Sequence, residues 1–96
     1  MKLLWAPEAV HDLVRLRAFL EPNSPAAAER AATRIRRLAA ALVVQPELGR
    51  VVENSPGLLD LIASFGAGAY VLRYRIYSDA VVVVRVWHSR ESRRSG

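Results

Sequence analysis

The chain has 96 residues, of which 52% are hydrophobic, and its formal net charge is +5. This length and composition exclude a disordered chain and predict one folded domain over residues 1–96. The absence of cysteine excludes a disulfide framework and thiolate metal sites, and it is typical of proteins in a reducing cytosol.

Targeting and membrane-spanning segments are not predicted. The longest apolar runs, such as residues 38–44, are much shorter than the roughly 18 residues that a membrane span needs. The N-terminal stretch is interrupted by Pro7 and Glu8 before a signal-peptide core could form. The two histidines, His11 and His88, show no metal-ligand spacing, and no cofactor motif is present. We therefore expect a soluble cytoplasmic protein without metal or cofactor.

The first third of the chain predicts a strand followed by a helix. Residues 2–5 are apolar and are bounded by Pro7, which favours a short strand. Over residues 8–20 the apolar side chains recur at steps of four, three and four, which is typical of one helix face: Ala9, Leu13, Leu16 and Leu20. The polar residues of this segment are expected to lie off that face: His11, Asp12, Arg15 and Arg17.

A second helix is predicted from Ser24 to about Val43. Ser24 is expected to cap it and Pro25 to occupy its first position, where a missing N–H costs nothing. Its buried stripe is predicted from the helical period: Ala28, Ala31, Ile35, Leu38 and Leu42. The arginines on its other side are interpreted as a solvated face. The short connection predicts that the two helices pack as an antiparallel hairpin.

The last half of the chain has an extended pattern. Residues 45–50 are predicted to form a loop, and three strands are predicted at 58–65, 69–77 and 80–88, the last two joined by a turn at Ser78 and Asp79. The order is β-α-α-β-β-β. We expect an α+β fold in which an N-terminal strand is followed by a helix hairpin packed on a small antiparallel sheet.

Positive charge is concentrated in these strands. Residues 61–96 hold six basic and two acidic residues, which suggests an acidic partner. A two- or four-residue turn would place Arg73 and Arg75 on the sheet face of His88, whereas a three-residue turn would place them with Arg85 and Trp87. In either register, at least two cations lie beside an aromatic or imidazole ring.

RNA cleavage is one chemistry that this cluster could support. It needs a base, an acid and cations that stabilise the developing charge on phosphate. His88 could act as base or acid, because imidazole changes charge near neutral pH, but a second proton carrier is missing. The alternative is structural, with His88 at the sheet margin, Trp87 in the core and a basic chain end. Direct nucleic-acid binding stays open, since no known binding motif is present.

An ordered set of motifs resembles the ParE/RelE superfamily of type II toxin–antitoxin toxins over nearly the whole chain. These motifs are WAPEAVHDL, PELGR, GLLDL, YVLRYRI and VVVVRVWHSRE. The resemblance implies two helices against a small antiparallel sheet. RelE-like members cut mRNA on the ribosome, whereas ParE-like members poison DNA gyrase.

Several departures from the RelE-like pattern favour ParE. Leu59 and Leu61 stand where RelE-like nucleases carry lysines, and Val71 stands where they carry an arginine. Arg90 matches their arginine after the last strand, but the sequence ends at Gly96, before the position of their catalytic tyrosine. Leu59 also departs from ParE-like sequences, which often have arginine there.

The resemblance thus predicts a growth-inhibiting toxin that binds DNA gyrase and is neutralised by a cognate antitoxin with an acidic or extended segment. The surface predicted to bind target or antitoxin is basic: Arg73, Arg75, Arg85, His88, Arg90 and Arg93. No catalytic residue is assigned on this interpretation. The alternative is a ribosome-dependent endoribonuclease, with a catalytic set of Arg73, Arg75, His88 and Arg90. A third hypothesis is a toxin-like protein that only binds a partner or forms oligomers.

Overall fold

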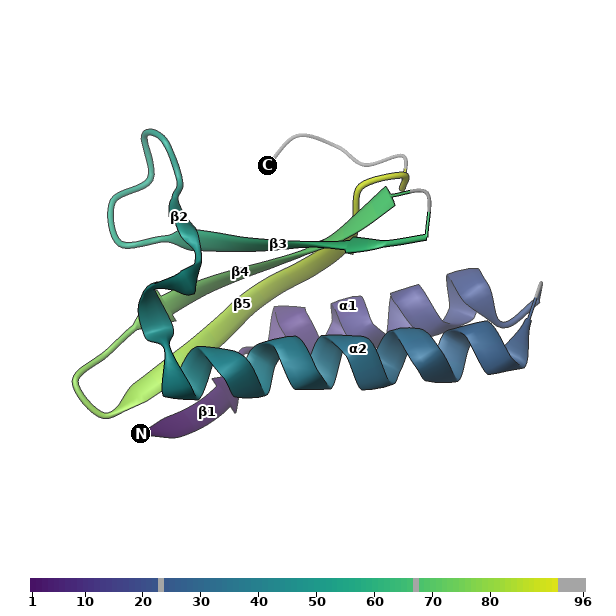
Figure 1. Cartoon of the computed structure of the whole chain (residues 1–96), viewed down its shortest axis with the longest axis horizontal. Helices are drawn as coiled ribbons and strands as arrows, with labels where there is room; N and C mark the ends of the chain where they lie inside the picture. Colours follow the sequence, from purple (N-terminus) through teal and green to yellow (C-terminus); the bar gives the residue numbers. More distant parts are fainter. Residues whose placement is uncertain (23, 67, 92–96) are drawn as a thin grey trace.

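The structure is a computed structural model that describes residues 1–22, 24–66 and 68–91 (Figure 1). Its elements follow in the order β1 (Lys2–Trp5), α1 (Pro7–Leu20), α2 (Pro25–Val44), a 3-10 helix (Pro46–Leu48), β2 (Arg50–Val51), β3 (Leu59–Phe65), β4 (Gly68–Ile76) and β5 (Ala80–His88). Among the described residues, no helix has both the length and the apolar character that a membrane crossing requires. The predicted α+β class is confirmed.

The two helices begin where their N-terminal residues predict. Pro7 opens α1, and Pro25 opens α2 after Ser24, whose Oγ accepts a hydrogen bond of 3.1 Å from the N–H of Ala27. The predicted stripe of α2 is buried or packed on the core. Because both stripes face the sheet, the hairpin covers one sheet face, and none of the helices of the described residues lies on the other face (Figure 1).

The sheet is larger than predicted and mixed. Its five strands run in the order β1-β5-β4-β3-β2. The three strands predicted to be antiparallel are so, but β1 lies parallel to β5, with Lys2 opposite Ala80 and Trp5 opposite Val83. This pairing needs a long crossover, which the helix hairpin provides. Strand β2 adds an antiparallel edge beside β3, and its first residue, Arg50, falls in the stretch predicted as a loop.

A β-bulge decides which side chains share a face of the last hairpin. The turn has two residues, since the N–H of Tyr77 donates to the carbonyl of Ala80 at 2.7 Å. Strict alternation would then place Arg73 on the face of His88. The register shifts by one residue between Arg73 and Tyr74, however, so Arg73 lies opposite Arg85 and Tyr70 lies opposite His88. The expectation for a two-residue turn is therefore wrong, because the bulge reverses the alternation.

The core lies between the helices and the sheet. Tyr70, Leu72 and Tyr74 of β4 are almost fully buried there, together with Val83 and Val86 of β5. The hydroxyl of Tyr74 donates to the carbonyl of Pro46 at 2.6 Å and accepts from the N–H of Gly49 at 2.8 Å. These bonds fix the loop before β2 to the sheet.

Candidate functional site

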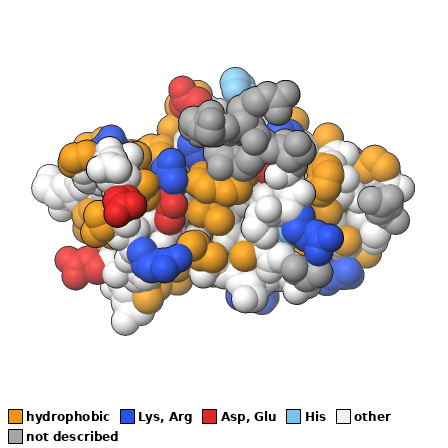
Figure 2. Space-filling view, turned by 90° about the horizontal axis from the view of Figure 1, so that it is seen from above, with side chains coloured by type: hydrophobic (Ala, Val, Ile, Leu, Met, Phe, Trp, Pro, Cys, Tyr) orange, Lys and Arg blue, Asp and Glu red, His pale blue; other side chains and the backbone are white. Residues whose placement is uncertain are grey.

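The sheet face without helices combines cationic and apolar side chains, and we call it the open face. Register assigns to it residues of three neighbouring strands: Asp60, Ile62, Arg73, Arg75, Arg85 and Trp87. Figure 2 views the molecule from the side of β2 and β3 and shows hydrophobic side chains at the surface between Lys or Arg side chains. Ile62 is 47% exposed on this face.

Arg73 is fixed in the middle of this face. Its guanidinium donates two hydrogen bonds to Asp60, from Nε to Oδ1 at 2.9 Å and from NH2 to Oδ2 at 3.1 Å. Its Cζ lies 5.0 Å from the ring centroid of Trp87, a cation–π geometry. Trp87 is therefore part of the open face rather than of the core, which was the structural alternative raised for it.

Arg85 is bound to a buried carboxylate that reaches the sheet from α1. Asp12 accepts two hydrogen bonds from Arg85, at 2.8 and 3.1 Å, and one from the N–H of Val86 at 2.8 Å. A further bond comes from Arg15. We call these four residues the Asp12 network. Burial raises the pKa of Asp12, but the bonds from Arg85, Val86 and Arg15 outweigh it, so that the pKa is lowered.

The prediction that Asp12 lies off the buried helix stripe is wrong. Asp12 is only 2% exposed, between the buried residues Ala9 and Leu16. The spacing carried a signal, because Asp12 follows Ala9 by three residues and precedes Leu16 by four, which is the period of a buried face. A charged side chain was not expected there, because its partners come from β5, more than 70 positions away.

The turn after β5 is held by Glu91. The carboxylate of Glu91 accepts two hydrogen bonds from Arg15, at 2.9 and 3.1 Å, and one from the N–H of His88 at 2.9 Å. Burial raises the pKa of Glu91, but the bonds from Arg15 and His88 outweigh the effect of burial, so that the pKa is lowered. The Nδ1 of His88 accepts from the N–H of Arg90 at 3.1 Å, and its ring lies edge-on to Tyr70, with centroids 4.9 Å apart.

The predicted basic surface is thus divided between different parts of the fold. Arg73 and Arg75 share the open face, and register places Arg85 there as well, although its guanidinium is bonded to Asp12 of α1. His88 lies opposite Tyr70, on the helix side of the sheet, and Arg90 lies in the turn beyond β5. Arg93 lies outside the described residues. The cationic side chains therefore do not surround His88.

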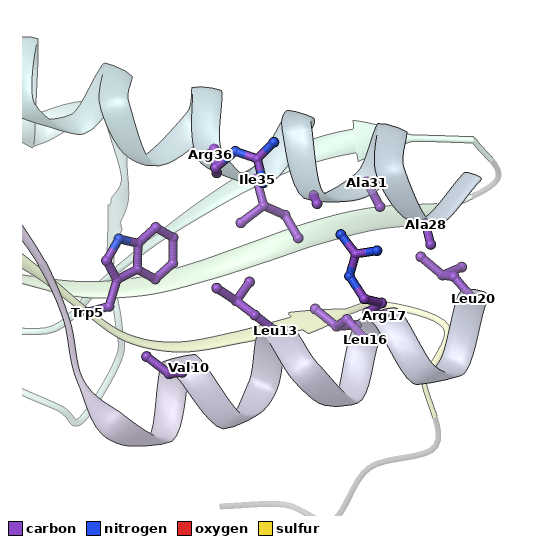
Figure 3. A pocket seen from close by; sticks show the side chains of 11 residues that line it. Trp5, Val10, Leu13, Leu16, Arg17, Leu20, Ala28, Ala31, Ile35 and Arg36 are labelled. Carbon is purple, nitrogen blue, oxygen red and sulfur yellow. The ribbon is translucent and has the colours of Figure 1, made fainter. Parts of the chain in front are cut away.

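A second candidate site, which the sequence did not predict, is a groove of about 340 Å³ between the helices (Figure 3). We call it the helix groove. Its apolar lining includes Val10, Leu13, Leu20, Ala28, Ala31 and Ile35. Two arginines, Arg17 and Arg36, also line it, and Arg17 forms an ion pair of 2.8 Å with Glu29 of the other helix. Small alanines on α2 leave the space that larger side chains would fill.

Comparison with known proteins places this fold among toxins of toxin–antitoxin systems. A chain from the solved structure of a chromosomal ParDE TA system from P. aeruginosa superposes with a TM-score of 0.72. The two chains are 22% identical, and the match covers 90% of this chain and 92% of that one. Among curated proteins of Caulobacter vibrioides, Toxin RelE3 is 45% identical over 91% of this chain and 92% of its own length. Toxin RelE1 of the same organism is 34% identical over 95% of this chain and 96% of its own length.

The protein is therefore a toxin of a type II toxin–antitoxin system. The family model described as "ParE toxin of type II toxin-antitoxin system, parDE" matches residues 3–93, and the chain belongs to this family. Its partner is a cognate antitoxin.

Proposed function

We propose that this toxin inhibits DNA gyrase by binding to it through the open face. The observation that carries the proposal is the composition of that face, where Trp87 and Ile62 lie among three arginines. Tryptophan and arginine are the residue types that most often dominate the binding energy of protein interfaces. The match to the ParE family supports gyrase as the target, as the sequence resemblance implied.

The arginines of the open face are arranged for binding. Asp60 and Asp12 hold Arg73 and Arg85 in fixed orientations, so that less side-chain entropy is lost when a partner binds. Arg75 is less constrained, since among residues 1–22, 24–66 and 68–91 its guanidinium donates only to the carbonyl of Pro56, at 3.3 Å. Arg75, which forms no ion pair with a carboxylate in the described part of the chain, offers its charge to an acidic group of a partner on the same face as the aromatic ring of Trp87.

A ribosome-dependent endoribonuclease is the second candidate, and the names of the relatives Toxin RelE3 and Toxin RelE1 favour it. Two observations weigh against it. The set proposed for catalysis is divided by the sheet, with Arg73 and Arg75 on the face opposite His88. Leu59 and Leu61, at positions where RelE-like nucleases carry lysines, pack against the core.

A pair of assays on the purified, antitoxin-free protein tests the proposal. We expect inhibition of gyrase supercoiling on relaxed plasmid and intact mRNA on translating ribosomes. The His88→Ala variant should retain gyrase inhibition within about threefold, because His88 lies off the open face. If the protein cut mRNA at defined codon positions and left gyrase activity unaffected, it would be a ribosome-dependent endoribonuclease instead. A loss of cutting of more than ~100-fold in His88→Ala would then assign it a proton-transfer role.

We further propose that the antitoxin inserts an amphipathic, acidic segment into the helix groove. The apolar lining provides burial, while Arg36, which forms no ion pair within the described residues, provides a charge of the complementary sign. A glutamate at Val10, which lines the groove and is 45% exposed, should lower antitoxin affinity by roughly 10-fold or more. The measurement is isothermal titration calorimetry of the two purified proteins.

Val14→Glu is the matched control for this prediction. Val14 lies one turn further along α1, is 65% exposed and is not part of the groove lining. We expect its antitoxin affinity to stay within about twofold of the wild type. Equal losses in both variants would indicate that the antitoxin covers α1 in general and that the groove has no special role.

A further inference from the structure

The outer side of α2 carries a row of three arginines that the open face and the helix groove do not use. Arg30, Arg34 and Arg37 follow one another at steps of four and three residues, so they lie on one side of the helix. All three are exposed. With a rise of about 1.5 Å per residue, the row is about 10 Å long. We call it the arginine row.

These charges are not neutralised within the described part of the chain. Arg15, Arg17, Arg73 and Arg85 each form an ion pair with a carboxylate. In contrast, across residues 1–22, 24–66 and 68–91, none of the carboxylates forms an ion pair with the arginine row. The row is therefore a concentration of positive charge that is available to an external anion.

The shape beside the row favours an extended polyanion. The three arginines border a shallow hollow of about 350 Å³, which Glu29, Thr33 and Phe65 also line, and the carboxylate of Glu29 is held by Arg17 at 2.8 Å. The ring of Phe65 packs on Tyr70, with centroids 5.1 Å apart, so it is engaged in the fold rather than presented as a stacking platform for unpaired bases. The row thus offers three guanidinium groups to a phosphate backbone and no aromatic platform for unpaired bases.

We propose that the arginine row binds the phosphate backbone of duplex DNA without sequence preference. Arginine forms bidentate hydrogen bonds with phosphate oxygens, and a row on a rigid helix can contact phosphates along one strand. A peptide partner would need apolar anchors, and on α2 these line the helix groove, on another side of the helix. The inference goes beyond the proposed function and does not depend on gyrase being the target.

Fluorescence anisotropy with a labelled duplex DNA of about 20 base pairs tests the proposal, using the full-length, antitoxin-free protein over a range of salt concentrations. Each phosphate contact contributes about 0.9 to the slope of log K against log salt. Arg34→Gln should therefore lower the slope by about 0.9, and the triple variant Arg30→Gln, Arg34→Gln, Arg37→Gln by up to about 2.7. Glutamine preserves helix propensity, so the fold should be retained.

Arg50→Gln is the control, because it removes the same charge from an exposed position on β2. Its slope should equal that of the wild type. Equal slope losses in Arg34→Gln and Arg50→Gln would overturn the proposal in favour of unspecific attraction to the net charge. If the protein bound an RNA hairpin much more tightly than the DNA duplex, and the triple variant lost this binding, RNA would be the ligand of the arginine row and the proposal of DNA would be overturned. Absence of DNA binding, together with weaker antitoxin binding by the triple variant, would assign the row to the antitoxin.

Discussion

Asp12→Ala should lower the free energy of unfolding by about 2–4 kcal/mol, the largest effect that we expect from a single change outside the apolar core. The variant leaves the N–H of Val86 buried without its partner and removes the acceptor shared by Arg85 and Arg15. The arginine side chains are 42% exposed and can turn to water, which limits the loss. For a domain of this size the melting temperature should fall by roughly 10–25 °C in thermal unfolding followed by circular dichroism.

The same network predicts how stability depends on pH. The pKa of Asp12 is lower in the folded protein than its ordinary value near 4. The ionised carboxylate therefore contributes its full share to the free energy of unfolding at pH values above about 4. The contribution is lost as the pH falls through the lowered pKa. Glu91, whose pKa is also lowered, acts in the same direction. Asp12→Asn should therefore show a weaker loss of stability between about pH 4 and pH 2 than the wild type.

Asp60→Ala provides the control, because within the described residues the Asp60 carboxylate is bonded to Arg73 alone and its side chain, 18% exposed, is less buried than that of Asp12. Its loss should be about 1 kcal/mol or less. If Asp12→Ala and Asp60→Ala were equally stable, the Asp12 network would have no special role in joining α1 to β5.

The parts of the fold that the sequence predicts are those that depend on neighbours in the chain. Ser24 and Pro25 define the start of α2 through local hydrogen bonding and backbone geometry, and the helical period identifies the buried stripes. The edge strands depend on remote partners instead. Strand β2 has two residues, too few to show an alternation, and the parallel pairing of β1 depends on β5 at the other end of the chain.

The candidate site could be predicted only in part, for a related reason. The sequence indicates that arginines would lie beside an aromatic ring, and Arg73 does lie over Trp87. Their separation from His88 follows from one bulged residue in β5, which leaves no mark in the alternation of valines. The helix groove depends on how α1 and α2 pack, and side-chain spacing along either helix does not specify the space between them.

Ile62→Glu should weaken gyrase inhibition by roughly 30- to 100-fold, equivalent to about 2–3 kcal/mol of binding free energy. Ile62 is 47% exposed on β3, beyond the two residues that pair with β2, where its burial by a partner would be favourable. A glutamate there would lose this burial and would repel an acidic partner that the neighbouring arginines attract. The measurement is the toxin concentration that halves gyrase supercoiling.

Val14→Glu also replaces an exposed aliphatic side chain by glutamate, but on α1, where Val14 is 65% exposed. The toxin concentration that halves gyrase supercoiling should stay within about twofold of the wild-type value. Arg75→Glu adds a second test on the open face with little structural risk, since the side chain of Arg75 is bonded, in the described part of the chain, to the carbonyl of Pro56 alone. Arg85 is unsuitable for charge reversal, because a glutamate there would face the buried carboxylate of Asp12. If Ile62→Glu and Arg75→Glu folded normally and inhibited gyrase as well as Val14→Glu, gyrase would have to bind elsewhere on the toxin. The two helices would then be the surface to test next, because they carry the groove and the exposed arginines Arg30, Arg34 and Arg37.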